Sequence, residues 1–123
     1  MTEIRLGVVE SRFAEIIWKN APITASALAK LADAELGWKK TTSYTALKRL
    51  CDKGIFRNDG GTVHVMVSRE QFYALQSEKF LEDTYNGSLP AFIAAFASRK
   101  AISAQELAQI RQMLDDYEKE GSV

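Results

Sequence analysis

Residues 41–67, TTSYTALKRLCDKGIFRNDGGTVHVMV, contain the pattern that decides the fold. The first half has helical spacing, with Leu47 and Leu50 on one side and polar side chains on the other. Gly54 is expected to follow the end of this helix, because glycine readily adopts the left-handed conformation found there. Two short strands come next, joined by the Asp-Gly-Gly sequence at 59–61, which is typical of a β-hairpin. A basic helix followed by a hairpin predicts a winged helix-turn-helix.

The polar face of this helix has the chemistry of a DNA-binding surface. Thr41 or Thr42 is the expected N-cap, and short hydroxyl side chains there let the backbone approach phosphates, which the helix dipole attracts. Tyr44 offers a ring to thymine methyl groups or sugars. A helix face in contact with solvent alone would favour Glu, Lys and Ala over Thr and Tyr. The residues predicted to contact DNA are Lys39, Lys40, Thr41, Thr42, Tyr44, Thr45, Lys48, Arg49 and Arg57.

The chain has a net charge of zero, but its charges are unevenly distributed. Residues 1–67 contain ten Lys or Arg and seven Asp or Glu, a difference of +3. Residues 68–123 contain six and nine, a difference of −3. Residues 36–57 contain six Lys or Arg and one acidic residue, Asp52. Positive charge is therefore concentrated in the predicted helix and hairpin, which favours a nucleic-acid partner.

The remainder of the first half is consistent with a winged helix. An apolar repeat from Phe13 to Ile17 predicts a helix, with Ser11 as the expected cap and Trp18 at the edge of the core. Thr24 is the expected cap of a second helix that follows a short strand at Ile23.

The hairpin strands are expected at 55–57 and 62–67. Alternation predicts that the valines at 63, 65 and 67 face the core and that the residues between them face outward. His64 is then an exposed strand residue, and Cys51 is a small apolar residue on the inner face of its helix.

The residues after Ser68 predict three more helices, at about 69–85, around 89–96 and at about 104–119. Ser68 and Ser103 each begin a capping box. These helices carry more large apolar residues than so short a segment can bury, so we expect a partner subunit to cover them. The alternative is a closed three-helix bundle packed against the wing. The predicted dimerisation residues are Phe80, Leu89, Phe92, Ile93, Leu107, Ile110 and Leu114.

Together these patterns predict a mainly α (α+β) chain, with a winged-helix DNA-binding domain at 1–68 and a helical dimerisation domain at 69–123. A single His, a single Cys and the lack of a glycine-rich phosphate loop argue against an enzyme, so no catalytic, cofactor or metal site is predicted. The sequence has no apolar stretch of membrane-spanning length and no signal peptide, so we expect a cytoplasmic protein without membrane insertion.

Several short motifs occur in a characteristic order along the chain. They are IIW at 16–18, Thr at 42 and 45, RL at 49–50, DKGI at 52–55, FL at 80–81, YNG at 85–87 and FA at 96–97. In these motifs the chain resembles the penicillinase-repressor family over nearly its whole length. The resemblance implies a homodimeric winged-helix repressor that binds a palindromic double-stranded DNA operator.

The resemblance also implies a mode of release, in which a membrane-bound sensor protease triggers cleavage next to a Phe in the helix before the last. Ala95–Phe96 is the corresponding bond, although Ala95 stands where the best-known members have Asn. Tyr44 replaces a frequent Arg and Ser43 a larger apolar residue, which implies a different operator sequence. The chain lacks a C-terminal cysteine cluster, which excludes copper sensing by that route. The alternative function is a winged helix that binds other proteins without sequence-specific DNA binding.

Overall fold

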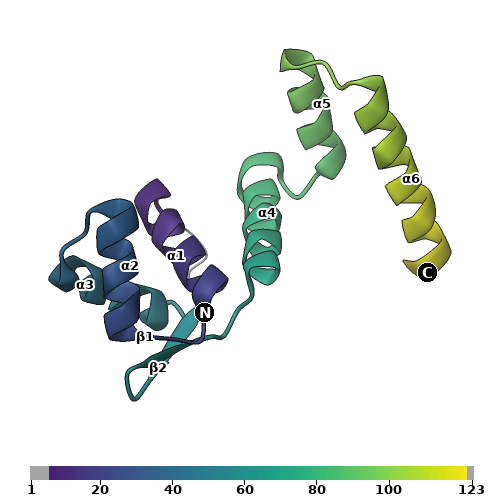
Figure 1. Ribbon diagram of the computed structural model, residues 1–123. Helices are drawn as coiled ribbons and strands as arrows, with labels where there is room; N and C mark the ends of the chain where they lie inside the picture. Colours follow the sequence, from purple (N-terminus) through teal and green to yellow (C-terminus); the bar gives the residue numbers. More distant parts are fainter. Residues whose placement is uncertain (1–5, 122–123) are drawn as a thin grey trace. The chain divides into compact units, whose positions relative to one another are not determined.

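The computed structural model describes residues 6–121, in which six helices and three strands follow one another (Figure 1). The elements are α1 (Val8–Asn20), β1 (Ile23–Thr24), α2 (Ala25–Leu36), α3 (Lys40–Asp52), β2 (Phe56–Asp59), β3 (Thr62–Val65), α4 (Arg69–Tyr85), α5 (Leu89–Arg99) and α6 (Ala104–Gly121). The predicted mainly α winged-helix fold is confirmed.

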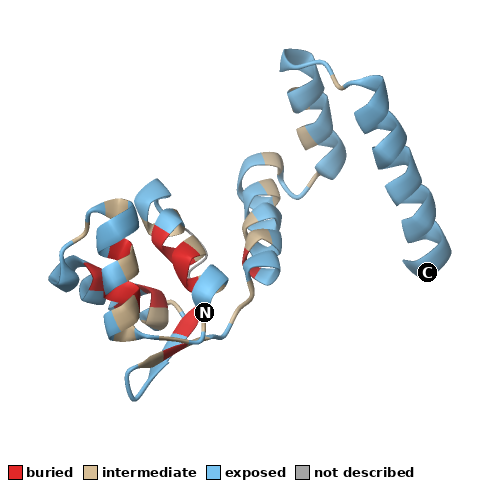
Figure 2. Cartoon of the chain, viewed as in Figure 1, coloured by how far each residue is buried: buried red, intermediate tan, exposed pale blue. Residues whose placement is uncertain are grey.

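The helices α1, α2 and α3 pack together beside a small antiparallel sheet with strand order β1-β3-β2. Buried residues gather where these elements meet, in red in Figure 2. Phe13 and Ile17 of α1, Leu28 of α2, Leu50 of α3 and Val63 of β3 are all fully or almost fully buried. Burial of such side chains stabilises a small domain by roughly 1.5–3 kcal/mol each. One compact core therefore holds α3 against the other elements.

Two helices begin earlier in the chain than the sequence predicts. The predicted cap Ser11 is wrong, because α1 already begins at Val8, with the Glu10 carboxylate accepting a hydrogen bond from the Gly7 N–H at 3.4 Å. The predicted N-cap at Thr41 or Thr42 is also wrong, because the cap of α3 is Lys39.

The start of α3 has a structural reason in the connection before it. Gly37 ends α2 in the left-handed conformation, and the Trp38 ring then packs 5.0 Å from the ring of Phe13. The chain therefore turns into α3 directly after Trp38. In contrast, the predicted cap Thr24 is confirmed, since its hydroxyl oxygen accepts a hydrogen bond from the Ala27 N–H at 3.2 Å.

The hairpin has the predicted turn, but its strands lie at 56–59 and 62–65 instead of the predicted 55–57 and 62–67. Gly60 and Gly61 both have positive φ, as a two-residue hairpin turn requires. Ile55 is not part of β2, because its N–H donates to the Leu50 carbonyl oxygen at 3.2 Å and thereby caps the C-terminal end of α3. At the other end, the N–H groups of Met66 and Val67 both donate to the Ile55 carbonyl, which ends the regular ladder.

The predicted inward alternation of the valines is correct for Val63 and wrong for Val65, which is exposed. The strand β1 has two residues and pairs with Thr62 and Val63, so Val65 lies beyond its end and is not covered by it. His64, expected to be exposed, is half-buried in its pairing opposite Arg57.

The chain divides into two compact units, residues 1–80 and 81–123, and the division falls within α4. It lies later than the boundary at residue 68 that the sequence suggests, because Phe72 of α4 is fully buried in the core of the first unit. The predicted capping box of α4 is present: Gln71 N–H donates to Ser68 Oγ at 3.1 Å, and Ser68 N–H donates to Gln71 Oε1 at 2.9 Å.

The second unit contains α5 and α6, in which no residue is buried (Figure 2). Their large apolar side chains are exposed or half-buried. The capping box at Ser103 forms its forward bond, in which the Glu106 N–H donates to Ser103 Oγ at 3.1 Å. Both helices are thus well formed locally, but their apolar faces are largely uncovered within one chain.

Candidate nucleic-acid interface

The helix α3 has one face in the core and one in solvent. Its inward face consists of Ser43, Ala46, Leu47 and Leu50, all buried. The predicted DNA-contacting residues of this helix are all exposed: Lys40, Thr41, Thr42, Tyr44, Thr45, Lys48 and Arg49. Lys39, the N-cap, is exposed as well. The core therefore fixes which face of α3 a ligand can reach.

Contacts within the exposed face hold several of its side chains in place. The Thr45 hydroxyl donates to the Thr41 carbonyl oxygen at 2.9 Å, and its oxygen can still accept a hydrogen bond. The Lys40 ammonium lies 5.6 Å from the centre of the Tyr44 ring, within the range of a cation–π contact. Lys48 Nζ lies 3.7 Å from the Asp52 carboxylate, but this pair is highly exposed and therefore weak. The face combines hydroxyl acceptors, an aromatic ring and three cations of α3 itself.

A surface groove borders this face on the side of α1. It is lined by Val9 and Glu10 from α1 and by α3 residues that include Thr42 and Arg49, and Trp38 contributes from the preceding connection. The flank of α3 that carries Arg49 is therefore open to solvent rather than covered by α1. An extended guanidinium there can reach a phosphate or a base edge.

A second groove borders the face on the side of α2, and it reveals a basic residue that sequence reasoning missed. Lys30 of α2 lines this groove together with Lys39, Lys40 and Asp33. All four of these residues are exposed. Lys30 is absent from the predicted site because a single lysine on a predicted surface helix carries no signal of its own. The packing of α2 beside α3 is what places Lys30 next to Lys39 and Lys40.

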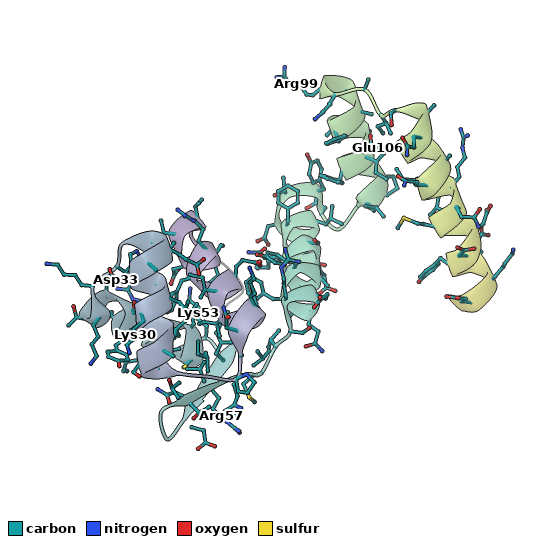
Figure 3. All side chains as sticks on the ribbon, in the orientation of Figure 1. Lys30, Asp33, Lys53, Arg57, Arg99 and Glu106 are labelled. Carbon is teal, nitrogen blue, oxygen red and sulfur yellow. The ribbon has the colours of Figure 1, made fainter. Side chains whose placement is uncertain are left out.

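The hairpin forms a second part of the candidate interface. Arg57 lies on the hairpin with 58% of its side chain exposed, and its guanidinium lies 3.9 Å from the Asp59 carboxylate (Figure 3). The turn is braced by the Asn58 side-chain oxygen, which accepts from the Gly61 N–H at 2.9 Å. The Gly61 carbonyl in turn accepts from the Ala25 N–H at 2.8 Å, which ties the turn to the start of α2. The hairpin is thus fixed to the helix-turn-helix.

Two further residues of α3, Ser43 and Cys51, are buried and half-buried, respectively. Ser43 is 2% exposed, and its hydroxyl has no hydrogen-bond partner within the described residues. Its side chain faces the core, as helical spacing predicts, so an effect of Ser43 on the operator sequence would act through the packing of α3. Burial raises the pKa of the Cys51 thiol above its ordinary value, a hydrogen bond with the Asn58 backbone opposes this shift, and the nearby Asp52 charge adds to it. Cys51 is half-buried, in agreement with its predicted role as a small apolar residue.

Within residues 6–121, His, Cys, Asp and Glu side chains form no group of three or more that could hold a metal ion. In the same part of the chain, every helix is too short or too polar to cross a lipid bilayer.

Comparisons with known proteins identify the family of this chain. The model of the penicillinase repressor family matches residues 6–116, which is most of the chain. The curated penicillinase repressor of Bacillus licheniformis is 26% identical over 107 residues, an alignment that covers 84% of each protein. The chain therefore belongs to the penicillinase repressor family of transcriptional repressors, which is not a family of enzymes.

Proposed function

We propose that this protein represses transcription by binding a palindromic operator as a homodimer, with α3 of each subunit in the major groove. The observation that carries this proposal is the two-sided nature of α3: one face is fixed in the core, and the opposite face is exposed, basic and rich in hydroxyl groups. A helix presented in this way is the reading element of helix-turn-helix proteins.

The residues of the exposed face divide by their expected targets. Lys39, Lys40 and Lys48 are suited to phosphates, because a flexible ammonium is a point charge that needs no fixed geometry. Tyr44 and Thr45 are suited to base edges and thymine methyl groups, and the Arg49 guanidinium, at the open flank of α3, is suited to a phosphate. Arg57 and the hairpin turn, which project beyond the helices, are suited to the neighbouring backbone. Phosphate contacts then set the position of the protein, and the few base contacts set its specificity.

Dimerisation is supported by the apolar residues of the second unit. Of the predicted dimerisation residues, Leu89, Ile93, Leu107, Ile110 and Leu114 are exposed in the single chain, as is Phe80 of α4, and Phe92 is half-buried. Leu107, Ile110 and Leu114 recur at helical spacing along one side of α6. A second copy of the chain is the occupant that the proposed palindromic operator requires, because each subunit supplies one reading helix.

We further propose that cleavage between Ala95 and Phe96, triggered by a membrane-bound sensor protease, releases the repressor. Phe96 is 47% exposed within α5, so its side chain is accessible for recognition. Removing the chain beyond this bond would delete α6 and thereby weaken the dimer. In cells with the target gene induced, mass spectrometry should find the fragment that ends at Ala95. An intact repressor together with a released operator would contradict this part of the proposal.

Selection of bound sequences from a pool of random duplex DNA tests the main proposal. The full-length protein should enrich an inverted repeat, and footprinting should show two protected half-sites whose centres lie about 10 base pairs apart or a multiple of that. A function on chromosomal operators also requires a cytoplasmic location. If the selection enriches no sequence, the alternative of a protein-binding winged helix without sequence-specific DNA binding is favoured.

A further inference from the structure

Three side chains join the first turns of α4 to the middle of α1. The Arg69 Nε atom donates to both carboxylate oxygens of Glu15, at 2.7 and 2.9 Å. The Tyr73 hydroxyl donates to Glu15 Oε1 at 3.2 Å, and the Arg69 guanidinium lies 5.0 Å from the centre of the Tyr73 ring. Glu15, Arg69 and Tyr73 thus contact one another in every pairwise combination. We refer to these three residues as the α1–α4 clamp.

An aromatic cluster lies beside the clamp and orients the same segment. The Trp18 indole N–H donates to the Val67 carbonyl oxygen at 3.0 Å, directly before α4. The Trp18 ring lies 5.5 Å from the ring of Phe72 and 5.9 Å from that of Tyr73. Phe72 is fully buried and packs α4 against the core. Arg69 lies about one turn before Phe72, and Tyr73 directly follows it. Contacts of these two residues with Glu15 therefore oppose a rotation of α4 about Phe72.

The clamp contributes little to stability for the number of contacts it makes. The side chains of Arg69 and Glu15 are 53% and 40% exposed, and ion pairs so accessible to water add little to the free energy of unfolding. The charge-assisted hydrogen bond of the Arg69 Nε–H, shared between the two Glu15 oxygens, together with the Tyr73 hydroxyl bond, is in contrast specific in direction. We therefore expect the clamp to affect the orientation of α4 more than the stability of the fold. All three clamp residues lie in the unit formed by residues 1–80, whereas α4 continues past that unit to Tyr85.

We infer that the α1–α4 clamp positions α4 on the winged helix and thereby sets the separation of operator half-sites that the dimer accepts. This inference rests on the proposed function, because it concerns two reading helices joined through the segments that follow α4. One inserted base pair shifts a half-site by about 3.4 Å and rotates it by about one-tenth of a turn. A dimer with a fixed α4 cannot follow that change, whereas one with a loosened α4 can. Glu15, Arg69 and Tyr73 are thus positioning residues that need not touch DNA.

Affinity for a series of operators tests the inference, with half-site separations altered by one or two base pairs in each direction. Wild-type protein should lose about tenfold or more in affinity at each altered separation, because avidity fails when both sites cannot be engaged together. Arg69→Ala and Glu15→Gln should flatten this profile to less than about threefold, while keeping wild-type affinity for a single half-site. The reversed pair, Glu15→Arg with Arg69→Glu, should regain part of the discrimination.

Arg12→Ala and Glu35→Gln are matched controls, because Arg12 and Glu35 are exposed and line the same surface groove as Glu15 and Arg69. Both controls should keep the steep wild-type profile. A steep profile in the clamp variants would overturn the inference, as would a flat profile in wild-type protein. If wild-type protein bound no operator of the series and no single half-site, the proposed function would fail, which is a distinct result. Tyr73→Phe removes one hydroxyl from the clamp and keeps the ring and its packing. It should therefore also flatten the profile of affinity against half-site separation.

Discussion

The Glu10 carboxylate of α1 lies 3.6 Å from the Lys53 ammonium at the C-terminal end of α3. The two side chains are 24% and 21% exposed, so the pair is largely shielded from solvent. Lys48, five residues earlier and within α3, has a side chain that is 79% exposed. Two lysines of one basic segment thus have different roles: Lys53 fastens α3 to α1, and Lys48 is available to a ligand.

Lys53→Ala should therefore lower the stability of the winged helix by about 1 kcal/mol, because it leaves the Glu10 carboxylate partly buried without this partner. Lys48→Ala should change stability by less than about 0.5 kcal/mol, because its ion pair is exposed. Urea unfolding measures both values. DNA affinity should show the reverse order, with the larger loss in Lys48→Ala. An equal loss of DNA affinity in the two variants would contradict the assignment of roles.

Ser43→Ala should make the protein more stable. Burying a hydroxyl without a hydrogen bond is unfavourable, and alanine is also the better helix former, so we expect a gain of about 1 kcal/mol. Thr42→Ala brings the same kind of gain in helix propensity but removes an exposed hydroxyl, so it should stabilise the protein clearly less than Ser43→Ala. Thermal or urea unfolding of the two variants checks this prediction. A clear loss of stability in Ser43→Ala would mean that its hydroxyl has a partner after all.

The tyrosine of the α1–α4 clamp should titrate above the ordinary range of tyrosines. Burial raises the pKa of Tyr73, and the charge of Glu15 and the hydrogen bond to it raise the pKa further, while Arg69 opposes the shift. The neutral phenol is therefore favoured by folding. Its contribution to stability is fully present below the ordinary tyrosine pKa of about 10 and is lost as the pH rises through the higher folded value.

Glu15→Gln should lower the pKa of Tyr73 without restoring its ordinary value, because the effect of burial remains. Ultraviolet absorbance of tyrosinate follows the titration, and Tyr73→Phe identifies which transition belongs to this residue. A Tyr73 pKa that does not respond to Glu15→Gln would show that the carboxylate is not its neighbour in solution.

The apolar stripe of α6 should be required for dimerisation. Leu114 is 56% exposed in the single chain, and Leu114→Glu places a charge where the second subunit is expected. The dimer should weaken by about thirtyfold or more, the effect of losing a central interface residue. Sedimentation velocity measures this, with Gln105→Glu on the opposite side of α6 as the control. Dimers of Leu114→Glu as tight as those of the wild type would refute the predicted interface.

The fold was predictable from sequence where local signals agree with one another. Ser68 with Gln71 marks the start of α4, and the glycines at 60 and 61 mark the hairpin turn, because each pattern satisfies backbone groups within a few residues. The start of α3 was mispredicted, since it depends on Trp38 packing against Phe13, a contact between distant positions. Local propensity cannot report such a contact.

The candidate site likewise has features that the local sequence predicts and features that only tertiary packing determines. Helical periodicity predicts which side chains of α3 face solvent, because one face must enter the core. Periodicity does not predict which residues of other elements lie beside that face. Lys30 joins the site, and Lys53 is held by Glu10, only through the packing of α2 and α1 against α3. The α1–α4 clamp escaped prediction for the same reason, since Glu15 and Arg69 are 54 positions apart.

The salt dependence of operator affinity in Arg49→Ala tests the central claim most directly. Arg49 is exposed at the flank of α3, and removing a phosphate-contacting cation should reduce the slope of log affinity against log salt concentration by about 0.9. Arg111→Ala removes the same charge from α6 and should keep the wild-type slope. The account predicts weaker binding with a shallower slope in Arg49→Ala alone. Wild-type affinity and slope in Arg49→Ala would contradict it.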